Sequence, residues 1–231
     1  MELKKFFRRL YVRIEFEAYC DRFYRKEERG EKDWIEFLSE LKNAREEIGD
    51  RAYRIVEKYN TKRRLNWLRK RKKEIEEFKN LEPYEAIKKF FYEEYLGCKF
   101  EGCDKDSALL KIERNGNLTI LHVICGNNCP ILYYSSKMGI DPLPICKKAY
   151  ESGAEAFLSE LMKICYGKKF EVIYTRNYEQ LRPRGLFCHE IVILKENPRD
   201  ESRCNKAILY SKLLSETSPN SSNFIPKPHS F

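Results

Sequence analysis

The hydrophobic pattern of this chain changes its period at Gly97, and that change limits the folds open to it. Before Gly97 the apolar side chains recur at helical spacing, whereas the runs ALLKIE and NLTILHVI after it are rich in β-forming residues. Asn115 and Gly116 lie between the two runs, and Asn-Gly is a strong signal for a β-hairpin. A helical half followed by a hairpin favours the α+β class with an antiparallel sheet.

Helices are predicted throughout the first half. Residues 2–28 fit a helix better than a strand, because no turn signal divides them. The helical period then continues over 34–59, with Asp33 placed to cap it, as one long helix or as two helices joined near Gly49. Another helix is expected over 83–96, where a proline stands in the first turn.

The second half is predicted to follow the order β-β-α-α-β-β. A short helix is expected over 130–139 and a longer one over 144–166, each ended by a glycine. The runs KFEVIYT and FCHEIVIL then supply two more strands. The expected organisation is a helical region over residues 1–96, a cysteine-rich α+β region over 97–195 packed with it as one domain, and a mobile tail over 196–231.

The chain has a formal net charge of +9, with eight basic residues concentrated in the run KRRLNWLRKRKK at 62–73. Apolar residues recur through this run at helical spacing, so we interpret it as the solvated face of a helix and expect no nucleic-acid partner. No apolar run approaches the roughly 18 residues of a membrane span, and charges interrupt the amino terminus. We therefore expect a cytoplasmic protein with no membrane partner, and its abundant Lys, Arg, Glu, Ile and Tyr resemble thermophile composition.

Nine cysteines are many for a cytoplasmic protein. Three of them are scattered and are interpreted as small hydrophobic core residues, namely Cys20, Cys165 and Cys204. The other six gather in the second half, at Cys98, Cys103, Cys125, Cys129, Cys146 and Cys188. For Cys98 and Cys103 the sequence leaves three uses open: a disulfide, a share in a metal site, or neither.

The segment NCPILYYSSKMGIDPLPICKKAY, with RGLFCHEIVI further on, resembles the L-2-amino-thiazoline-4-carboxylic acid hydrolase family. The matching features are Cys129–Pro130 at the start of a helix, Cys146 beyond a proline-containing loop, and Gly185 to Cys188 before the last strand, and the resemblance spans residues 46–195. It implies hydrolysis of a small C–N substrate, thiazoline or amidine-like. This chain has Leu186 and Phe187 where the family usually carries an acidic residue before the last cysteine. Related four-vinyl-reductase-like domains bind metal or small molecules, which supplies the alternative of a non-enzymatic sensor module.

The residue types suit such a hydrolysis. Cys129 precedes a helix that begins with proline, where the helix dipole favours a thiolate nucleophile. Glu190 or His189 could donate the proton that the departing nitrogen needs. Strand alternation puts Cys188 and Glu190 on one face and His189 on the other, so Glu190 is the better companion for the cysteines.

The same thiols could instead bind zinc or an iron–sulfur cluster, with Cys125, Cys129, Cys146 and Cys188 as ligands. Their spacing matches no standard zinc or ferredoxin pattern. The sequence therefore leaves two other interpretations open: a nucleophilic cysteine that acts without a metal, and thiols or a disulfide with a purely structural role. We predict that Cys129, Cys146 and Cys188 converge on one site, because each stands where an element begins. The expected partner is a small-molecule substrate, and the sequence leaves a homo-oligomer open.

Overall fold

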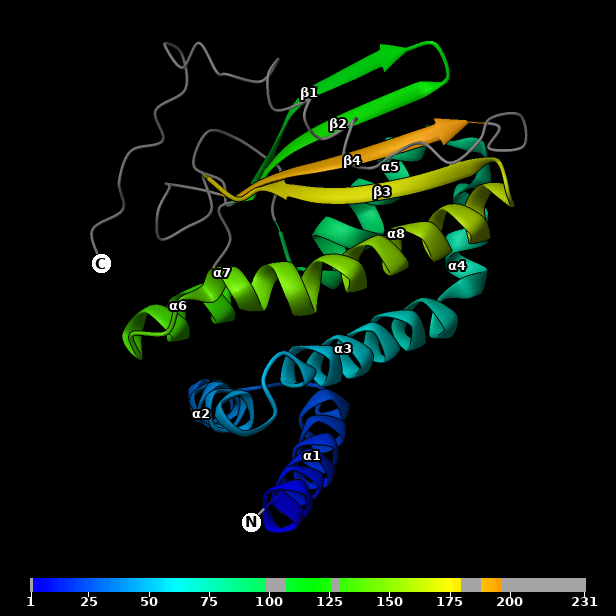
Figure 1. Ribbon diagram of the computed structural model, residues 1–231. Coiled ribbons are helices and arrows are strands. Elements are labelled where there is room, and N and C mark those ends of the chain that lie inside the picture. The colour runs from blue at the N-terminus through cyan, green and yellow to red at the C-terminus, as the bar shows by residue number, and fades with distance from the viewer. Residues whose placement is uncertain (1, 99–106, 126–128, 180–187, 197–231) are drawn as a thin grey trace.

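The computed structural model describes residues 2–98, 107–125, 129–179 and 188–196 (Figure 1). The helical half contains α1 (Glu2–Arg25), α2 (Glu31–Ile48), α3 (Arg51–Lys70), α4 (Lys72–Glu76), the 3-10 turn η1 (Glu77–Asn80), α5 (Pro83–Ala86) and η2 (Ile87–Tyr95). The second half contains β1 (Ser107–Asn115), β2 (Leu118–Cys125), α6 (Pro130–Lys137), α7 (Pro142–Ile145), η3 (Cys146–Tyr150), α8 (Glu151–Tyr166), β3 (Phe170–Asn177) and β4 (Cys188–Glu196).

Helix boundaries in the first half follow the local chemistry. The predicted helix over 2–28 is confirmed as α1, and the pattern over 34–59 divides into α2 and α3 at Gly49, whose φ of 61° suits glycine. Asp33 was expected to cap α2, but Gly30 is the N-cap. The Asp33 carboxylate instead accepts a hydrogen bond from the Gly30 N–H at 3.0 Å, as the third residue of a capping box.

Two segments depart from regular α-helix. The helix expected over 83–96 becomes a π-helix in η2, and the helix expected from residue 144 begins at Pro142 and passes through a second π-helical turn, η3, before α8. The Asp141 side chain caps that helix by accepting from the Leu143 N–H at 3.0 Å. Single π-helical turns occur often at functional sites, and η3 begins with Cys146.

The four strands form one antiparallel sheet in the order β1-β2-β4-β3. Strands β1 and β2 are the predicted hairpin, turning at Gly116 with a φ of 58°. Strand β4 lies between β2 and β3, so the last strand of the described chain is inserted into the middle of the sheet. The helical first half and this sheet confirm the α+β class and the β-β-α-α-β-β order.

The layers are sheet, α8 and α3, with α1 and α2 farthest from the sheet (Figure 1). One cluster of buried hydrophobic residues runs from Phe16 in α1 through α2, α3, η2 and α8 to Leu194 in β4. A separate small cluster of Ile120, Ile191 and Ile193 lies on the other face of the sheet. The predicted mobile tail lies outside the described residues, except that Glu196 is the last residue of β4.

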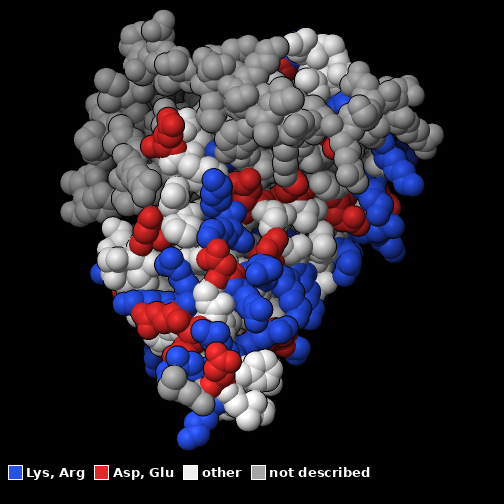
Figure 2. Space-filling model, viewed as in Figure 1, with Lys and Arg blue, Asp and Glu red and all other residues white. Residues whose placement is uncertain are grey.

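The basic run at 62–73 is only in part the solvated surface that its pattern suggested. Lys and Arg side chains gather over α3 with Asp and Glu among them (Figure 2). Arg71 lies 3.1 Å from Glu94 and stacks over the Trp67 ring, but Arg64 is buried and its Nε donates to Asn60. Within the described chain, no helix has the length and apolar character needed to cross a membrane.

Candidate functional site

Four cysteines begin or end the elements that border the helix-covered face of the sheet. Cys125 ends β2 and Cys188 begins β4, and the two are direct partners in the strand register. Cys129 is the N-cap residue of α6, with Pro130 in the first helical position. Cys146 begins η3 and is buried. The predicted element boundaries are thus present, although Cys146 stands four residues inside its helical segment rather than at its start.

The groups that shift the pKa of Cys146 include two of the other three cysteines, Cys129 and Cys188. The pKa of the Cys146 thiol is raised to about 12, chiefly by burial, and the neighbouring Cys129, Cys188 and Glu190 contribute to the rise. Only the Arg176 guanidinium acts in the opposite direction. Groups influence each other in this way only at short range, so Cys146 shares one buried environment with side chains from α6 and β4.

Cys129 differs from the sequence-based expectation in its protonation. The backbone N–H groups of Leu132 and Ile131 and the Arg176 guanidinium do favour its thiolate, as expected at a helix N-terminus. Burial outweighs them, so the pKa of the Cys129 thiol is raised rather than lowered. Cys129 is therefore a protonated thiol at neutral pH, and a reaction at this sulfur must also remove its proton.

A buried ion pair lies on the same face of the sheet. Arg176 in β3 and Glu190 in β4 are register partners, and Arg176 Nε donates to Glu190 Oε1 at 3.2 Å. Their side chains are 12% and 4% exposed, which is well below the exposure of the ion pairs on the helices. Glu190 Oε2 is buried, and the Tyr92 and Tyr174 hydroxyls hydrogen-bond to the Glu190 carboxylate. A buried carboxylate with an ion pair and neutral donors around it is a candidate functional group.

Two tyrosines complete the polar surroundings of Glu190. Burial raises the pKa of Tyr92 in η2 well above its ordinary value, and the Glu190 carboxylate raises it further. Tyr174 in β3 behaves in the same way, with Arg176 opposing the shift. Both hydroxyls are therefore neutral donors beside a carboxylate. Sequence reasoning missed Tyr92, Tyr174 and Arg176, and only the alternation of Tyr174 and Arg176 along one strand could have suggested the last two.

His189 does not belong to this group. It lies on the opposite face of the sheet, as strand alternation predicted, and its Nε2 is 3.1 Å from His122 Nδ1 on β2. Burial lowers the pKa of His189 to about 4 and also lowers the pKa of His122. Of the two predicted proton donors, only Glu190 faces the cysteines, because consecutive residues of a strand point to opposite faces.

The described residues contain no group of three or more His, Cys, Asp or Glu side chains arranged to hold a metal ion. The prediction of zinc or an iron–sulfur cluster at Cys125, Cys129, Cys146 and Cys188 therefore has no support from the described part of the chain. We derive no chemical step through a metal.

The other three cysteines of the described chain are buried. Cys20 is fully buried among the residues of the main core, as predicted. Cys165 is also buried, and its thiol donates to the Ile75 carbonyl at 3.6 Å. Cys98 is buried, whereas its predicted companion Cys103 lies outside the described residues, as do Cys204, Gly185, Leu186 and Phe187.

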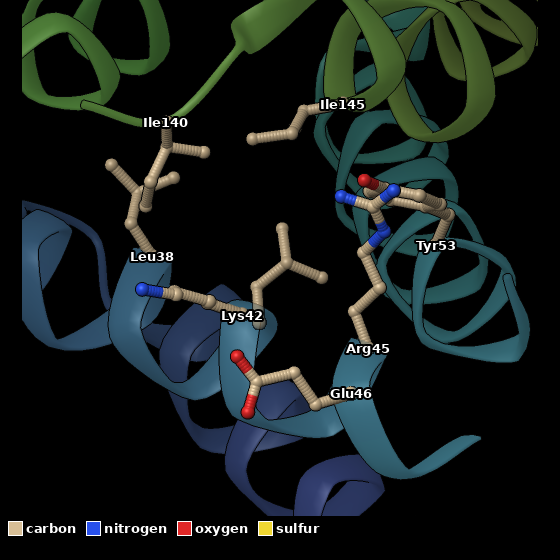
Figure 3. Close-up of a pocket in the computed structure, with 8 residues that line it drawn as sticks. Leu38, Lys42, Arg45, Glu46, Tyr53, Ile140 and Ile145 are labelled. Carbon is tan, nitrogen blue, oxygen red and sulfur yellow. The ribbon is translucent and has the colours of Figure 1, made fainter. Parts of the chain in front are cut away.

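A separate pocket lies between α2, α3 and the segment around α7 (Figure 3). Its volume is about 210 Å³, and its apolar side chains include Leu38, Ile140 and Ile145. Lys42 and Arg45 supply positive charge at its α2 side, where the Arg45 guanidinium lies 5.6 Å from the centre of the Tyr53 ring. Ile145 directly precedes Cys146, so the pocket adjoins the cysteine site through one stretch of backbone.

Comparison of the chain with protein-family models, curated proteins and solved structures finds no match.

Proposed function

We propose that the protein hydrolyses a small substrate with a C–N bond of the thiazoline or amidine type at the cysteine site. The observation that carries the proposal is the buried Glu190 carboxylate, paired with Arg176 through one oxygen, on the same face of the sheet as Cys188 and in the same environment as Cys146. A buried carboxylate beside protonated thiols provides both a base and a nucleophile.

In the proposed reaction the Cys129 sulfur bonds to the carbon of the C=N group, and the thiol proton passes to the substrate nitrogen. The C–N bond then breaks, and the departing amine takes a proton from the second nitrogen on the same carbon, which re-forms a C=N bond to that carbon. A water molecule attacks the same carbon and gives a proton to Glu190, and that proton returns to the sulfur as the C–S bond breaks. Because the substrate nitrogen accepts the thiol proton, the raised pKa of Cys129 is compatible with this sequence.

The test is amine release from 2-amino-thiazoline-4-carboxylate and from simple amidines. We expect Cys129→Ser and Glu190→Gln each to lower kcat/KM by about a hundredfold or more, in the range typical of general acid–base groups. Cys165→Ser is the matched control, because Cys165 is a buried thiol that hydrogen-bonds to Ile75 away from the cysteine site. Full activity in Cys129→Ser, or no release from any of these substrates, would refute the proposal.

The second candidate is a small-ligand sensor without turnover, and the pocket beside α7 favours it (Figure 3). Apolar walls with Lys42, Arg45 and Glu46 at one side give the pocket a net positive charge, which suits a small anion with an apolar portion. A thermal shift with such carboxylates that is lost in Lys42→Ala, without amine release, would support this candidate. Metal analysis of the purified protein, with a visible spectrum, tests the metal- or cluster-dependent form of the sensor.

A further inference from the structure

The amino-terminal half of α1 carries an exposed apolar surface, which we call the outer stripe. Six of the nine exposed large hydrophobic side chains among the described residues belong to it, so the exposure is concentrated rather than scattered. Its members and their exposed fractions are Leu3 68%, Phe6 61%, Phe7 57%, Leu10 40%, Tyr11 61% and Ile14 59%.

The outer stripe is not a continuation of the surface by which α1 packs on the protein. Its residues follow the i, i+3, i+4, i+7 spacing of one helix face. The residues of α1 that contact the core, including Phe16, Cys20 and Phe23, lie on the opposite side of the helix at about 100° per residue. The helix therefore has two apolar faces, and only one of them is covered by the described residues.

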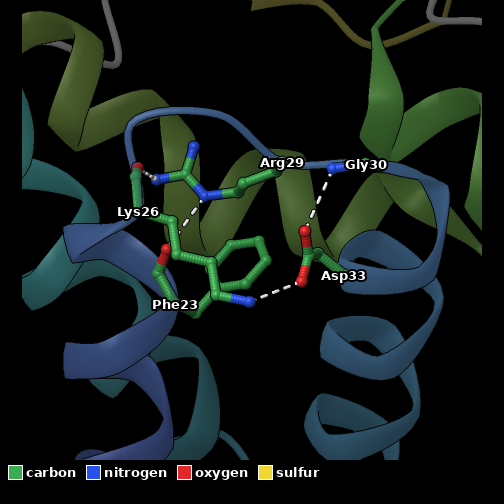
Figure 4. Close-up of polar contacts among 5 residues, drawn as sticks. All are labelled: Phe23, Lys26, Arg29, Gly30 and Asp33. Atoms are coloured by element: carbon green, nitrogen blue, oxygen red, sulfur yellow. Dashed lines mark hydrogen bonds and ion pairs between the residues drawn. The ribbon is translucent and has the colours of Figure 1, made fainter.

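The carboxy-terminal half of α1 is firmly held. The Arg29 guanidinium donates to the Phe23 carbonyl at 2.9 Å and to the Lys26 carbonyl at 3.1 Å, and so satisfies the end of the helix (Figure 4). The Phe23 ring stacks on Phe37 of α2 with centroids 4.3 Å apart. The amino-terminal half consequently projects from the body with a fixed orientation (Figure 1).

Positive charge accompanies the apolar side chains. Between Glu2 and Ile14 the helix has five basic residues and one acidic residue. Two of the five are paired, Arg8 with Glu47 of α2 and Arg13 with Glu17, and blue, white and red side chains lie together where α1 projects (Figure 2). Helical spacing places Lys4 and Arg8 along one border of the outer stripe and Arg13 along the other. This arrangement lets the basic heads lie beside a surface into which the apolar side chains insert.

We propose that the outer stripe of α1 docks on an anionic lipid surface, with the helix lying in the plane of the interface. A second copy of this chain fits less well, because pairing two outer stripes would bring together the basic residues that border each one, Lys4, Arg8 and Arg13. Anionic headgroups complement that charge, and Phe, Leu and Ile opposite Lys and Arg is the pattern of interfacial helices. The proposal departs from the sequence-based expectation of no membrane partner, and it is independent of the cysteine site.

The test is cosedimentation of the full chain with vesicles of phosphatidylcholine alone and of phosphatidylcholine with phosphatidylglycerol. We expect binding to the anionic vesicles that weakens in high salt. A stripe variant should reduce this binding by about tenfold or more, because it removes three inserting side chains. The stripe variant combines Phe6→Ser, Phe7→Ser and Leu10→Ser.

Two further variants make the result specific. A charge variant should also weaken binding to the anionic vesicles. A control variant, which replaces three exposed apolar residues elsewhere, should bind like the original chain. The charge variant combines Lys4→Gln, Arg8→Gln and Arg13→Gln, the basic residues that border the outer stripe, and the control combines Ile35→Ser, Leu81→Ser and Tyr133→Ser.

The same samples define the contrary outcomes. Equal binding to neutral vesicles, or no binding to either kind, would overturn the proposal. A dimer in solution that becomes a monomer in the stripe variant, without vesicle binding, would assign the outer stripe to a second copy instead. Circular dichroism of every variant checks that α1 remains folded, which its exposed positions lead us to expect.

Discussion

Arg176 Nε and Glu190 Oε1 lie 3.2 Å apart between neighbouring strands, in a region that the helices shield from solvent. Removing one partner of a buried ion pair leaves the other charge without compensation, which costs about 3–5 kcal/mol. We therefore expect Arg176→Met to lower the free energy of unfolding by about that amount, measured by urea denaturation. The double variant Arg176→Met with Glu190→Leu should recover most of the loss, whereas additive losses would mean that the pair is not coupled.

The two histidines of the opposite face predict the acid sensitivity of the fold. The pKa of His189 is lowered to about 4, from an ordinary value of 6.5, chiefly by burial and also by His122. The unfolded chain therefore binds more protons than the folded chain between these pH values, so stability falls as the pH drops from about 6.5 towards 4. Acidification to about pH 4 should lower the free energy of unfolding by roughly 3 kcal/mol through His189, since a tenfold change in proton affinity is worth about 1.4 kcal/mol.

Thermal unfolding of the original chain and of His189→Gln, followed from pH 7.5 to 4.5, measures this effect. The fall in Tm on acidification should be smaller in the variant, because glutamine does not take up a proton. Glu113 lies 3.6 Å from His122 and favours its charged form, so His122→Gln should flatten the profile less than His189→Gln does. An equal fall in Tm on acidification in the original chain and both variants would show that His189 is not the source of the acid sensitivity.

The exposure of the cysteines predicts the order of their reactions. Among the described cysteines, Cys129 is the one that is only partly buried, and its pKa is raised. Iodoacetamide should therefore modify Cys129 first in the folded protein, about tenfold faster than Cys146 or Cys165, with a rate that keeps rising above pH 8.5. Peptide mass spectrometry after timed labelling measures each site separately. Simultaneous labelling of Cys129 and Cys146 would show that the site opens more readily than the structure indicates.

The elements of this fold follow from local sequence, but the partners within the site do not. The helical period, Gly49, Pro130 and the Asn115–Gly116 turn are local signals, and the helices and hairpin that they predict are present. The two π-helical segments are absent from the pattern, because one added residue per turn leaves the apolar spacing nearly unchanged.

The pairing of Arg176 with Glu190 depends on the strand order β1-β2-β4-β3, which no local pattern specifies. A charged residue in a strand such as FEVIYTRN is ordinarily expected on the solvent side. The contact of His122 with His189 has the same origin, because it requires β2 and β4 to be neighbours. Conversely, the separation of Glu190 from His189 could be predicted, since alternation along a strand is a local property.

Close packing of α3 against α8 gives a prediction about the helical layer beneath the sheet. A Cβ atom added to Gly153 would lie 2.9 Å from Asn60 Nδ2 and 3.2 Å from Thr61 Oγ1, both on α3. Asn60 is buried and its Nδ2 donates to the Ala149 carbonyl at 3.4 Å, so it cannot move without losing that contact. Gly153→Ala should therefore destabilise the protein by about 1–3 kcal/mol, as overpacking does, although alanine favours helices. Gly30→Ala is the control for packing alone in denaturant titration: an added Cβ there meets nothing within 4 Å, so its loss should not exceed the fraction of a kcal/mol that alanine costs at the N-cap of α2. An unchanged or raised stability of Gly153→Ala would mean that α3 and α8 pack less closely than the structure has them.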